Sequence, residues 1–213
     1  MEWKTKDATF VSTNAAQFIL RGIKKYQVVV VEGPSGIGKS FTARHVTLAL
    51  QREGFEIRPI TDAEDIINNE QKETKQVFLI EDVMGQCYSK LSILEHWQDN
   101  EQNLLSTLRR CSNIKLVFTI RSNIYKHLMV MKLLKHFGAV GFKMSSDELS
   151  LSPKERRIIW HSYVKDIKLD EIGEDTVSKY PYLPLLCHLY TQRKDKSDKR
   201  AMHDLFKEPF QAV

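Results

Sequence analysis

The sequence has little cysteine, no long apolar run and no dense cluster of one charge. Its three cysteines, Cys87, Cys111 and Cys187, are odd in number and far apart, which excludes a disulfide framework and a cysteine-rich zinc site. They are typical of reduced cytoplasmic thiols. No apolar run approaches the ~20 residues that a membrane helix needs. Charged side chains at positions 2, 4, 6 and 7 argue against a secretory signal. We therefore expect a cytoplasmic protein that does not insert into membranes.

The overall charge is positive, but it is distributed along the chain. The 213 residues carry a formal net charge of +5 and include 42% hydrophobic and 28% charged residues. This composition is typical of a soluble globular protein that buries a sizeable core. The dispersed positive charge favours anionic ligands in general and gives only weak support for nucleic-acid binding.

One stretch of eight residues has the pattern G-x-x-x-x-G-K-S, which is typical of phosphate binding. It follows the β-branched run Val28–Val31, which favours a buried strand, and it leads into a helical pattern. The glycines permit a tight turn that points backbone N–H groups at phosphate oxygens, and the helix adds its positive end. Lys39 would reach the β- and γ-phosphates, and Ser40 would ligate Mg²⁺. The alternative is a glycine-rich turn without a ligand. The predicted nucleotide contacts are Gly33, Pro34, Ser35, Gly36, Ile37, Gly38, Lys39, Ser40 and Phe41.

A second apolar run, Gln76–Ile80, ends in the carboxylates Glu81 and Asp82. A buried strand that delivers acidic side chains beside a phosphate loop is the Walker B pattern, which holds Mg²⁺ and polarises an attacking water. By position, Glu81 is predicted to lie on the metal side and Asp82 to act as the base or to position the water. The alternative is a strand that simply ends in polar residues.

A third run, Ile114–Arg121, favours another buried strand that ends in a cation. If this strand lies between the loop strand and the Walker B strand, its end reaches the γ-phosphate. Arg121 is therefore a predicted sensor that bonds phosphate oxygens, and the alternative is an arginine that only caps the sheet.

The remaining pattern alternates strands and helices up to about residue 145. We expect a helix after a cap at Ser12 or Thr13, a strand over 55–60, a short helix near residue 66, and one or two helices within 86–112. Ile124, Leu128 and Met131 predict one helical stripe, and residues 140–144 predict a fifth strand. The expected fold is α/β, a P-loop NTPase with a five-stranded, mostly parallel sheet of the additional-strand type. Phe10 and Val11, before the first helix, are candidate contacts for a nucleotide base, unless this segment only closes a sheet edge.

From about residue 146 the pattern becomes helical only. Ser152, Pro153 and Glu155 form a strong helix start, and Pro184 opens a later helix. A short helix is expected over 170–179 and a solvated loop over 193–200. The predicted organisation is a nucleotide-binding α/β domain over residues 1–145 and a small helical lid over 146–213.

Five stretches form an ordered set: Gly33–Ser40, Glu81–Gly85, Thr119–Arg121, Leu151–Arg156 and Tyr182–Cys187. Together they resemble the STAND class of signalling ATPases, most closely the third family of novel STAND NTPases. The resemblance covers about residues 10–210. It implies an ATP-binding switch, often joined to other domains in immune and cell-death proteins, with Arg121 sensing the γ-phosphate and Pro184 against the adenine or its sugar. The family usually has two aspartates at this strand end, whereas this chain has Glu81 before Asp82. The triplet Met-His-Asp at 202–204 spells a histidine motif of related switch ATPases, but it follows Pro184 too closely to belong to that motif.

The function expected from these patterns is an ATP- or ADP-gated signalling switch with Mg²⁺ and slow hydrolysis. Nucleotide-dependent homo-oligomers and flanking effector or sensor domains are the expected partners, since the end just after Phe210 suggests a piece of a longer protein. Two alternatives stay open at this point. One is a small-molecule or nucleoside kinase, which would use lid arginines such as Arg156 and Arg157. The other is a scaffold that binds nucleotide without hydrolysing it.

Overall fold

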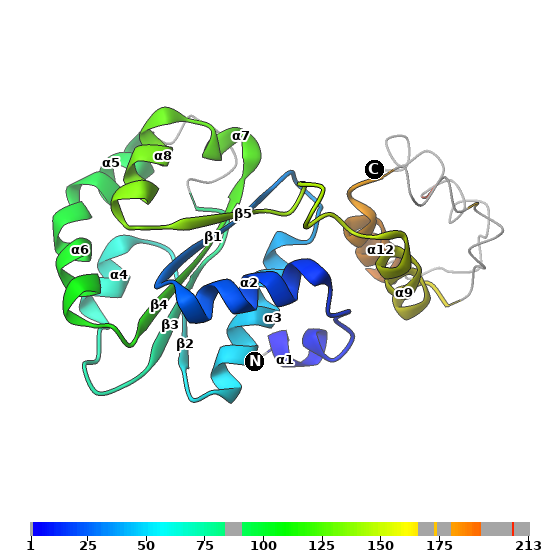
Figure 1. Cartoon of the computed structure of the whole chain (residues 1–213), viewed down its shortest axis with the longest axis horizontal. Coiled ribbons are helices and arrows are strands. Elements are labelled where there is room, and N and C mark those ends of the chain that lie inside the picture. Colours follow the sequence, from blue (N-terminus) through cyan, green and yellow to red (C-terminus); the bar gives the residue numbers. More distant parts are fainter. Residues whose placement is uncertain (1, 84–90, 166–172, 174–179, 193–205, 207–213) are drawn as a thin grey trace.

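The computed structural model describes residues 2–83, 91–165, 173, 180–192 and 206 (Figure 1). Within them, no helix is both long and apolar enough to cross a membrane. The strands are β1 (Val28–Gly33), β2 (Glu56–Ile60), β3 (Gln76–Ile80), β4 (Ile114–Arg121) and β5 (Val140–Lys143). The helices are α1 (Glu2–Asp7), α2 (Asn14–Lys25), α3 (Lys39–Arg52), α4 (Ala63–Asn68), α5 (Leu91–Asp99), α6 (Glu101–Arg110), α7 (Ser122–Tyr125), α8 (Leu128–His136), α9 (Pro153–Tyr163) and α12 (Leu183–Gln192).

The five strands form one sheet in the order β2-β3-β4-β1-β5, and every pair is parallel. β4 lies between β1 and β3, with Val30 opposite Phe118 on one side and Phe78 opposite Leu116 on the other. The α/β fold with an additional strand between the loop strand and the acidic strand is therefore confirmed.

Both faces of the sheet are covered by helices, as a parallel sheet requires. Side chains alternate along each strand, so Val28 and Val30 of β1 face one core while Val29 and Val31 face the other. Helices α4 to α8 cover the first face, and α2 and α3 cover the second (Figure 1). The result is a three-layer sandwich in which β1, β3 and β4 are almost fully buried, whereas the edge strands β2 and β5 are partly exposed.

Several helix boundaries follow the local chemistry of the sequence. The Thr13 hydroxyl accepts a hydrogen bond from the Ala16 N–H and so caps α2. After α3 and α8, Gly54 and Gly138 have φ values of 90° and 67°, the left-handed conformation in which glycine is favoured. By contrast, α1 has no counterpart in the sequence-based prediction.

The prediction of a single stripe through Ile124, Leu128 and Met131 is wrong. α7 ends at Tyr125 and a new helix, α8, begins at Leu128, so the helical phase restarts. α8 then buries Val130 and its partners Leu133 and Leu134, which leaves Leu128 and Met131 on the outer face.

The helices α9 and α12 pack on each other around their own apolar cluster, which includes the buried rings of Trp160, Tyr190 and Phe206. Arg156 supports this helical unit by donating hydrogen bonds to the backbone oxygens of Leu151 and Tyr180. The predicted division near residue 146 stays a prediction. The helix expected over 170–179, the loop over 193–200 and the triplet at 202–204 lie outside the described residues.

Glu155 joins the helical unit to the α/β body. Its carboxylate accepts hydrogen bonds from the Ser152 N–H at 2.8 Å and the Ser152 hydroxyl at 2.7 Å, which completes the predicted capping box of α9. It also accepts one from the Asn14 N–H at 2.6 Å, at the start of α2. Burial alone would raise the pKa of Glu155, but these hydrogen bonds and the nearby Arg156 lower it overall.

A pH-dependent stability follows for Glu155. A carboxylate with a lowered folded-state pKa stabilises the fold above its unfolded pKa, about 4.3, and loses this contribution as the pH falls through the folded value. At neutral pH we expect Glu155→Gln to cost about 0.5–1 kcal/mol, in the range of a weakened helix cap, and the deficit to shrink below pH ~4. Urea unfolding of both proteins at several pH values measures this difference in the free energy of unfolding.

The matched control is Glu148→Gln, which removes the same charge from an exposed position on the same segment. A deficit for Glu155→Gln that does not change between pH 7 and pH ~3 would contradict the role of its ionised form.

Candidate functional site

The turn between β1 and α3 has the geometry that its glycines predict. Gly36 and Gly38 have φ values of 79° and 100°, in the left-handed region that favours glycine. Gly38 is the N-cap of α3 and provides no side-chain hydrogen bond, and the first turn of α3 has no acidic residue. The first N–H groups and the positive end of this helix therefore suit an anion.

A cavity of about 230 Å³ lies over this turn, and we call it the loop cavity. It gathers side chains from the loop, from the ends of β3 and β4 and from α12. Nine of the predicted site residues line it: Ser35, Gly36, Gly38, Lys39, Ser40, Phe41, Asp82, Arg121 and Pro184. Three lining residues were not predicted as site residues: Thr119, Leu185 and His188.

Lys39 lies in the loop cavity with its ammonium group folded back on the turn. Its Nζ donates a hydrogen bond to the Pro34 backbone oxygen at 2.9 Å. Burial lowers the pKa of Lys39, the nearby Asp82 carboxylate opposes this, and Arg121 adds to the lowering. An anion in the cavity would relieve the repulsion between Lys39 and Arg121.

Asp82 and Arg121 form an ion pair across the ends of β3 and β4. The Arg121 Nε donates to Asp82 Oδ1 at 3.2 Å, and its Nη2 donates to Asp82 Oδ2 at 3.3 Å. Asp82 has a φ of 50°, uncommon outside glycine, and its N–H donates to the Thr119 hydroxyl at 2.8 Å. The predicted sensor arginine and the predicted water-positioning carboxylate thus lie together, bonded to each other.

Glu81 points to a different partner. Its Oε2 accepts hydrogen bonds from the Arg44 Nη2 at 2.6 Å and Nε at 3.1 Å, and Arg44 also lies 5.2 Å from the centre of the Trp3 ring. Glu81 is absent from the described lining of the loop cavity. Its second oxygen, Oε1, is buried and has no hydrogen-bond partner among the described residues. The metal role of Glu81 stays a prediction, and the unpaired Oε1 is the atom that could serve it.

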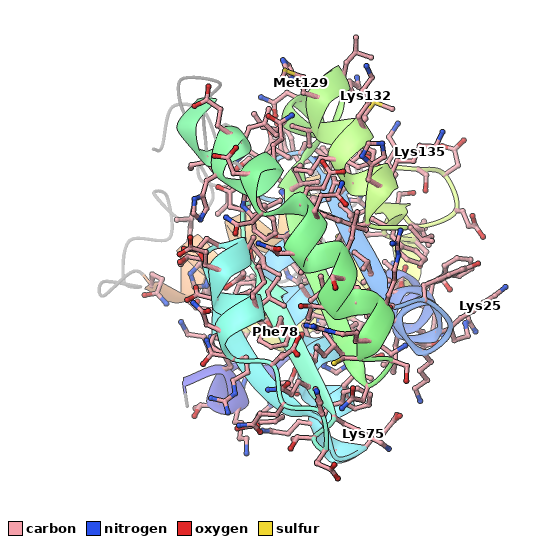
Figure 2. All side chains as sticks on the ribbon, turned by 90° about the vertical axis from the view of Figure 1, so that its left-hand side faces the viewer. Lys25, Lys75, Phe78, Met129, Lys132 and Lys135 are labelled. Atoms are coloured by element: carbon pink, nitrogen blue, oxygen red, sulfur yellow. The ribbon has the colours of Figure 1, made fainter. Side chains whose placement is uncertain are left out.

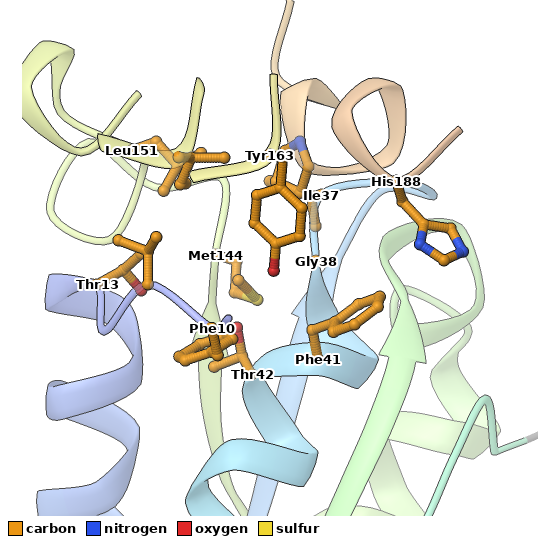
Figure 3. A pocket seen from close by; sticks show the side chains of 13 residues that line it. Phe10, Thr13, Ile37, Gly38, Phe41, Thr42, Met144, Leu151, Tyr163 and His188 are labelled. Carbon is orange, nitrogen blue, oxygen red and sulfur yellow. The ribbon is translucent and has the colours of Figure 1, made fainter. Parts of the chain in front are cut away.

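A smaller apolar recess, of about 50 Å³, adjoins the loop cavity and shares Gly38, Phe41, Pro184 and His188 with it (Figure 3). The predicted base contacts Phe10, Val11 and Pro184 all line this recess. Figure 3 shows the Tyr163 ring reaching from the helical unit toward Met144 and Phe41. The other lining residues are Thr13, Ile37, Thr42, Leu151 and Ile159.

The helical unit lies directly against the loop. A Cβ atom at Gly36 would come within 2.9 Å of Leu185 Cδ2 and 3.0 Å of Tyr182 Cβ, so only glycine fits there. A Cβ at Gly33 would similarly lie 2.9 Å from Ile37. Gly33 and the adjoining Pro34 shape the turn but do not line either cavity.

Two of the three lining residues that the sequence did not predict could have been identified from their spacing to predicted site residues. Thr119 lies two positions before Arg121 in a strand, so both project from the same face. His188 lies four positions after Pro184 in a helix, so it too shares a face, and its ring packs edge-on against Phe41 at 5.6 Å. No signal in the sequence pairs Arg44 with Glu81, because they come from different elements.

Among the described residues, no group of three or more His, Cys, Asp and Glu could by itself hold a metal ion. Ser40 and Asp82 nevertheless line the same cavity. A hydroxyl and a carboxylate fit Mg²⁺, which proteins usually bind through one or two such ligands together with substrate phosphates and water.

The sheet order, the loop and the acidic strand end define a P-loop NTPase of the additional-strand type. The family model of Novel STAND NTPase 3 matches residues 10–166, and the chain belongs to this family. A comparison with curated proteins finds no match.

Among solved structures, two of RuvB from Thermotoga maritima are similar, one a variant and one described as the Holliday junction branch migration motor. They are 15% and 16% identical in sequence, with TM-scores of 0.45 and 0.46. The matches cover 81% and 84% of this chain, which spans only 58% and 61% of the RuvB chains.

Removing the Lys39 ammonium should abolish tight nucleotide binding. We expect Lys39→Ala to weaken ATP binding about 100-fold or more, since each lost charged hydrogen bond to phosphate is worth roughly 1.5–3 kcal/mol. Calorimetric titration with ATP and Mg²⁺ measures this, and Lys154→Ala, at an exposed lysine of α9, is the control. Unchanged affinity in a folded Lys39→Ala protein would overturn the assignment of the loop.

Proposed function

We propose that the chain is an ATP- or ADP-gated switch module that hydrolyses ATP slowly. The observation that carries this proposal is that the loop cavity is lined both by the α/β body and by α12 of the helical unit. A nucleotide there contacts both parts at once. Its chemical state therefore affects how the two parts are held together.

In the proposed complex, the phosphates lie over the loop and the base lies toward the apolar recess. Lys39 and the N–H groups at the start of α3 bind the phosphate oxygens, while Phe10, Val11 and Pro184 surround the base or its sugar. Because the recess is small, a base would need part of the adjoining loop cavity as well, next to the packed rings of Phe41 and His188. When bound, Mg²⁺ would neutralise phosphate charge, held by Ser40 and a carboxylate of the Walker B strand.

The Arg121–Asp82 ion pair supports a mechanism for distinguishing ATP from ADP. Arg121 reaches a γ-phosphate only by changing its bond to Asp82, and this change frees the carboxylate to orient a water. ADP has no γ-phosphate and leaves the pair intact. A charged hydrogen bond worth roughly 1.5–3 kcal/mol biases the two arrangements about ten- to hundredfold.

The kinase alternative has less support. Arg156 is engaged with the backbone oxygens of Leu151 and Tyr180, and neither it nor Arg157 is among the described residues that line the loop cavity. A kinase needs such cations beside the transferred phosphate. The scaffold alternative differs from the switch only in turnover and in the response to ADP, which the experiments below measure.

Family membership supports the wider setting of this proposal. We place the chain, as a nucleotide-binding domain with a helical lid, inside a larger signalling protein of the immune or cell-death type. Nucleotide-dependent oligomerisation would follow from the same family relation.

The two carboxylates should have separable effects on hydrolysis. We expect Asp82→Asn to slow single-turnover hydrolysis at least ~100-fold, a typical loss for a general base, while ATP affinity stays nearly unchanged. Glu81→Gln should instead raise the Mg²⁺ concentration that hydrolysis needs. Rapid turnover by Asp82→Asn together with none by Glu81→Gln, at saturating Mg²⁺, would mean that the two roles are reversed.

The switch itself predicts different protection of the helical unit by ATP and ADP. We expect hydrogen exchange in residues 152–165 and 180–190 to differ between the two complexes, and Arg121→Ala to remove this difference without abolishing ADP binding. Arg110→Ala, which breaks a surface contact with Glu70, is the matched control. If wild-type protein exchanges identically with both nucleotides, the scaffold is the better description.

A further inference from the structure

The outer face of α8 carries an unusual concentration of exposed apolar side chains. Leu128 is 71% exposed, Met129 44% and Met131 45%, and these are three of the five large hydrophobic residues exposed in the described part of the chain. Exposed hydrophobic residues scattered singly are ordinary, whereas a cluster marks a contact surface. The cluster arises because Val130, Leu133 and Leu134 already bury the inner face of the helix.

Lysines share this outer face. Lys126 precedes α8, and Lys132 and Lys135 lie on its outer face near Met129 (Figure 2). These three lysines are exposed and form no ion pair with the described residues. We call Leu128, Met129, Met131, Lys132 and Lys135 the α8 patch.

The sequence that includes the α8 patch carries lysine and arginine but no acidic side chain over a long stretch. Residues 102–146 contain no aspartate or glutamate. One acidic side chain from another element, Glu101, bonds α8, and it lies 2.6 Å from the Nδ1 of His136 at the far end of the helix. Within this stretch of sequence, Lys126, Lys132 and Lys135 are therefore the charged side chains next to the apolar residues at the start of α8.

We propose that the α8 patch is a docking surface for an acidic, amphipathic segment of a partner protein. Leucine and methionine give an adaptable apolar contact, and the lysines on the same face attract and orient carboxylates. An anionic membrane fits less well, because the larger apolar face of α8 is already packed in the core and cannot enter a lipid surface. A nucleic-acid partner would contact the lysines but would leave the 71% exposed side chain of Leu128 without an apolar partner.

The test uses the whole chain and a fluorescein-labelled peptide of about 18 residues, long enough to form a helix. The peptide has leucine at positions i, i+3, i+4 and i+7 and glutamate at most others. We expect binding with a Kd on the order of 10 μM that weakens with added salt. Lys132→Glu/Lys135→Glu and Leu128→Ser/Met131→Ser should each weaken binding about tenfold or more.

The matched control variants carry the same kinds of substitution, lysine to glutamate and apolar residue to serine, outside the α8 patch. Lys25→Glu/Lys75→Glu alters the net charge equally at two exposed lysines, also labelled in Figure 2, and should change the Kd less than about twofold. Ile158→Ser removes another exposed apolar side chain, 43% exposed, and should behave likewise. A peptide with lysine in place of glutamate should not bind.

Four results would overturn the proposal. The first is no binding of the acidic peptide, and the second is equal binding by all variants. The third is self-association of the wild-type chain in sedimentation that Leu128→Ser/Met131→Ser abolishes, which would make the patch an interface between copies. The last is co-pelleting with phosphatidylserine vesicles that the same variant loses, in the absence of peptide binding.

Discussion

The parallel direction of all five strands is the constraint on which this site depends. Each strand runs the same way, so the carboxyl ends of β1, β3 and β4 meet at one edge of the sheet. Each of these ends is followed by a functional element: the loop after β1, the acidic pair after β3 and Arg121 at the end of β4. Residues from Ser35 after β1 to Arg121 at the end of β4 therefore line a single cavity. The parallel arrangement in turn requires helices on both faces, which is why the buried strands are almost entirely apolar.

The electrostatics of the loop cavity are unbalanced without an anion. Lys39 and Arg121 repel each other there, and Asp82 is the carboxylate among the described lining residues. Arg121 resolves part of this imbalance by bonding Asp82, and Lys39 by bonding the Pro34 backbone oxygen. Phosphate groups would offer both cations a stronger partner. The cations that make these two bonds are thus the groups that a nucleotide would redirect.

The helical unit is tied to the α/β body at two kinds of contact. Glu155 connects the start of α9 to the start of α2 through hydrogen bonds, at some distance in sequence from the loop. Leu185 and Tyr182 lie against Gly36, on the loop itself. The first contact does not involve nucleotide-binding residues, whereas the second does. A change at the loop would therefore act on α12 more directly than on the capped start of α9.

The sequence by itself determined the loop, the five strands and the capping box at Ser152, because each depends on neighbouring residues. The place of β4 between β1 and β3 was expected from the pattern of P-loop ATPases, and the sheet confirms it. The sequence also identified most of the residues that line the two cavities. Only the tertiary structure decided that Arg121 bonds Asp82, that Glu81 bonds Arg44, and that α12 covers the loop. These pairings join elements that are distant in sequence, and local patterns carry no information about which of two adjacent carboxylates points into a cavity. The outer face of α8 was likewise missed, since a two-residue break after α7 shifted the helical phase and exposed side chains that an unbroken helix would have buried.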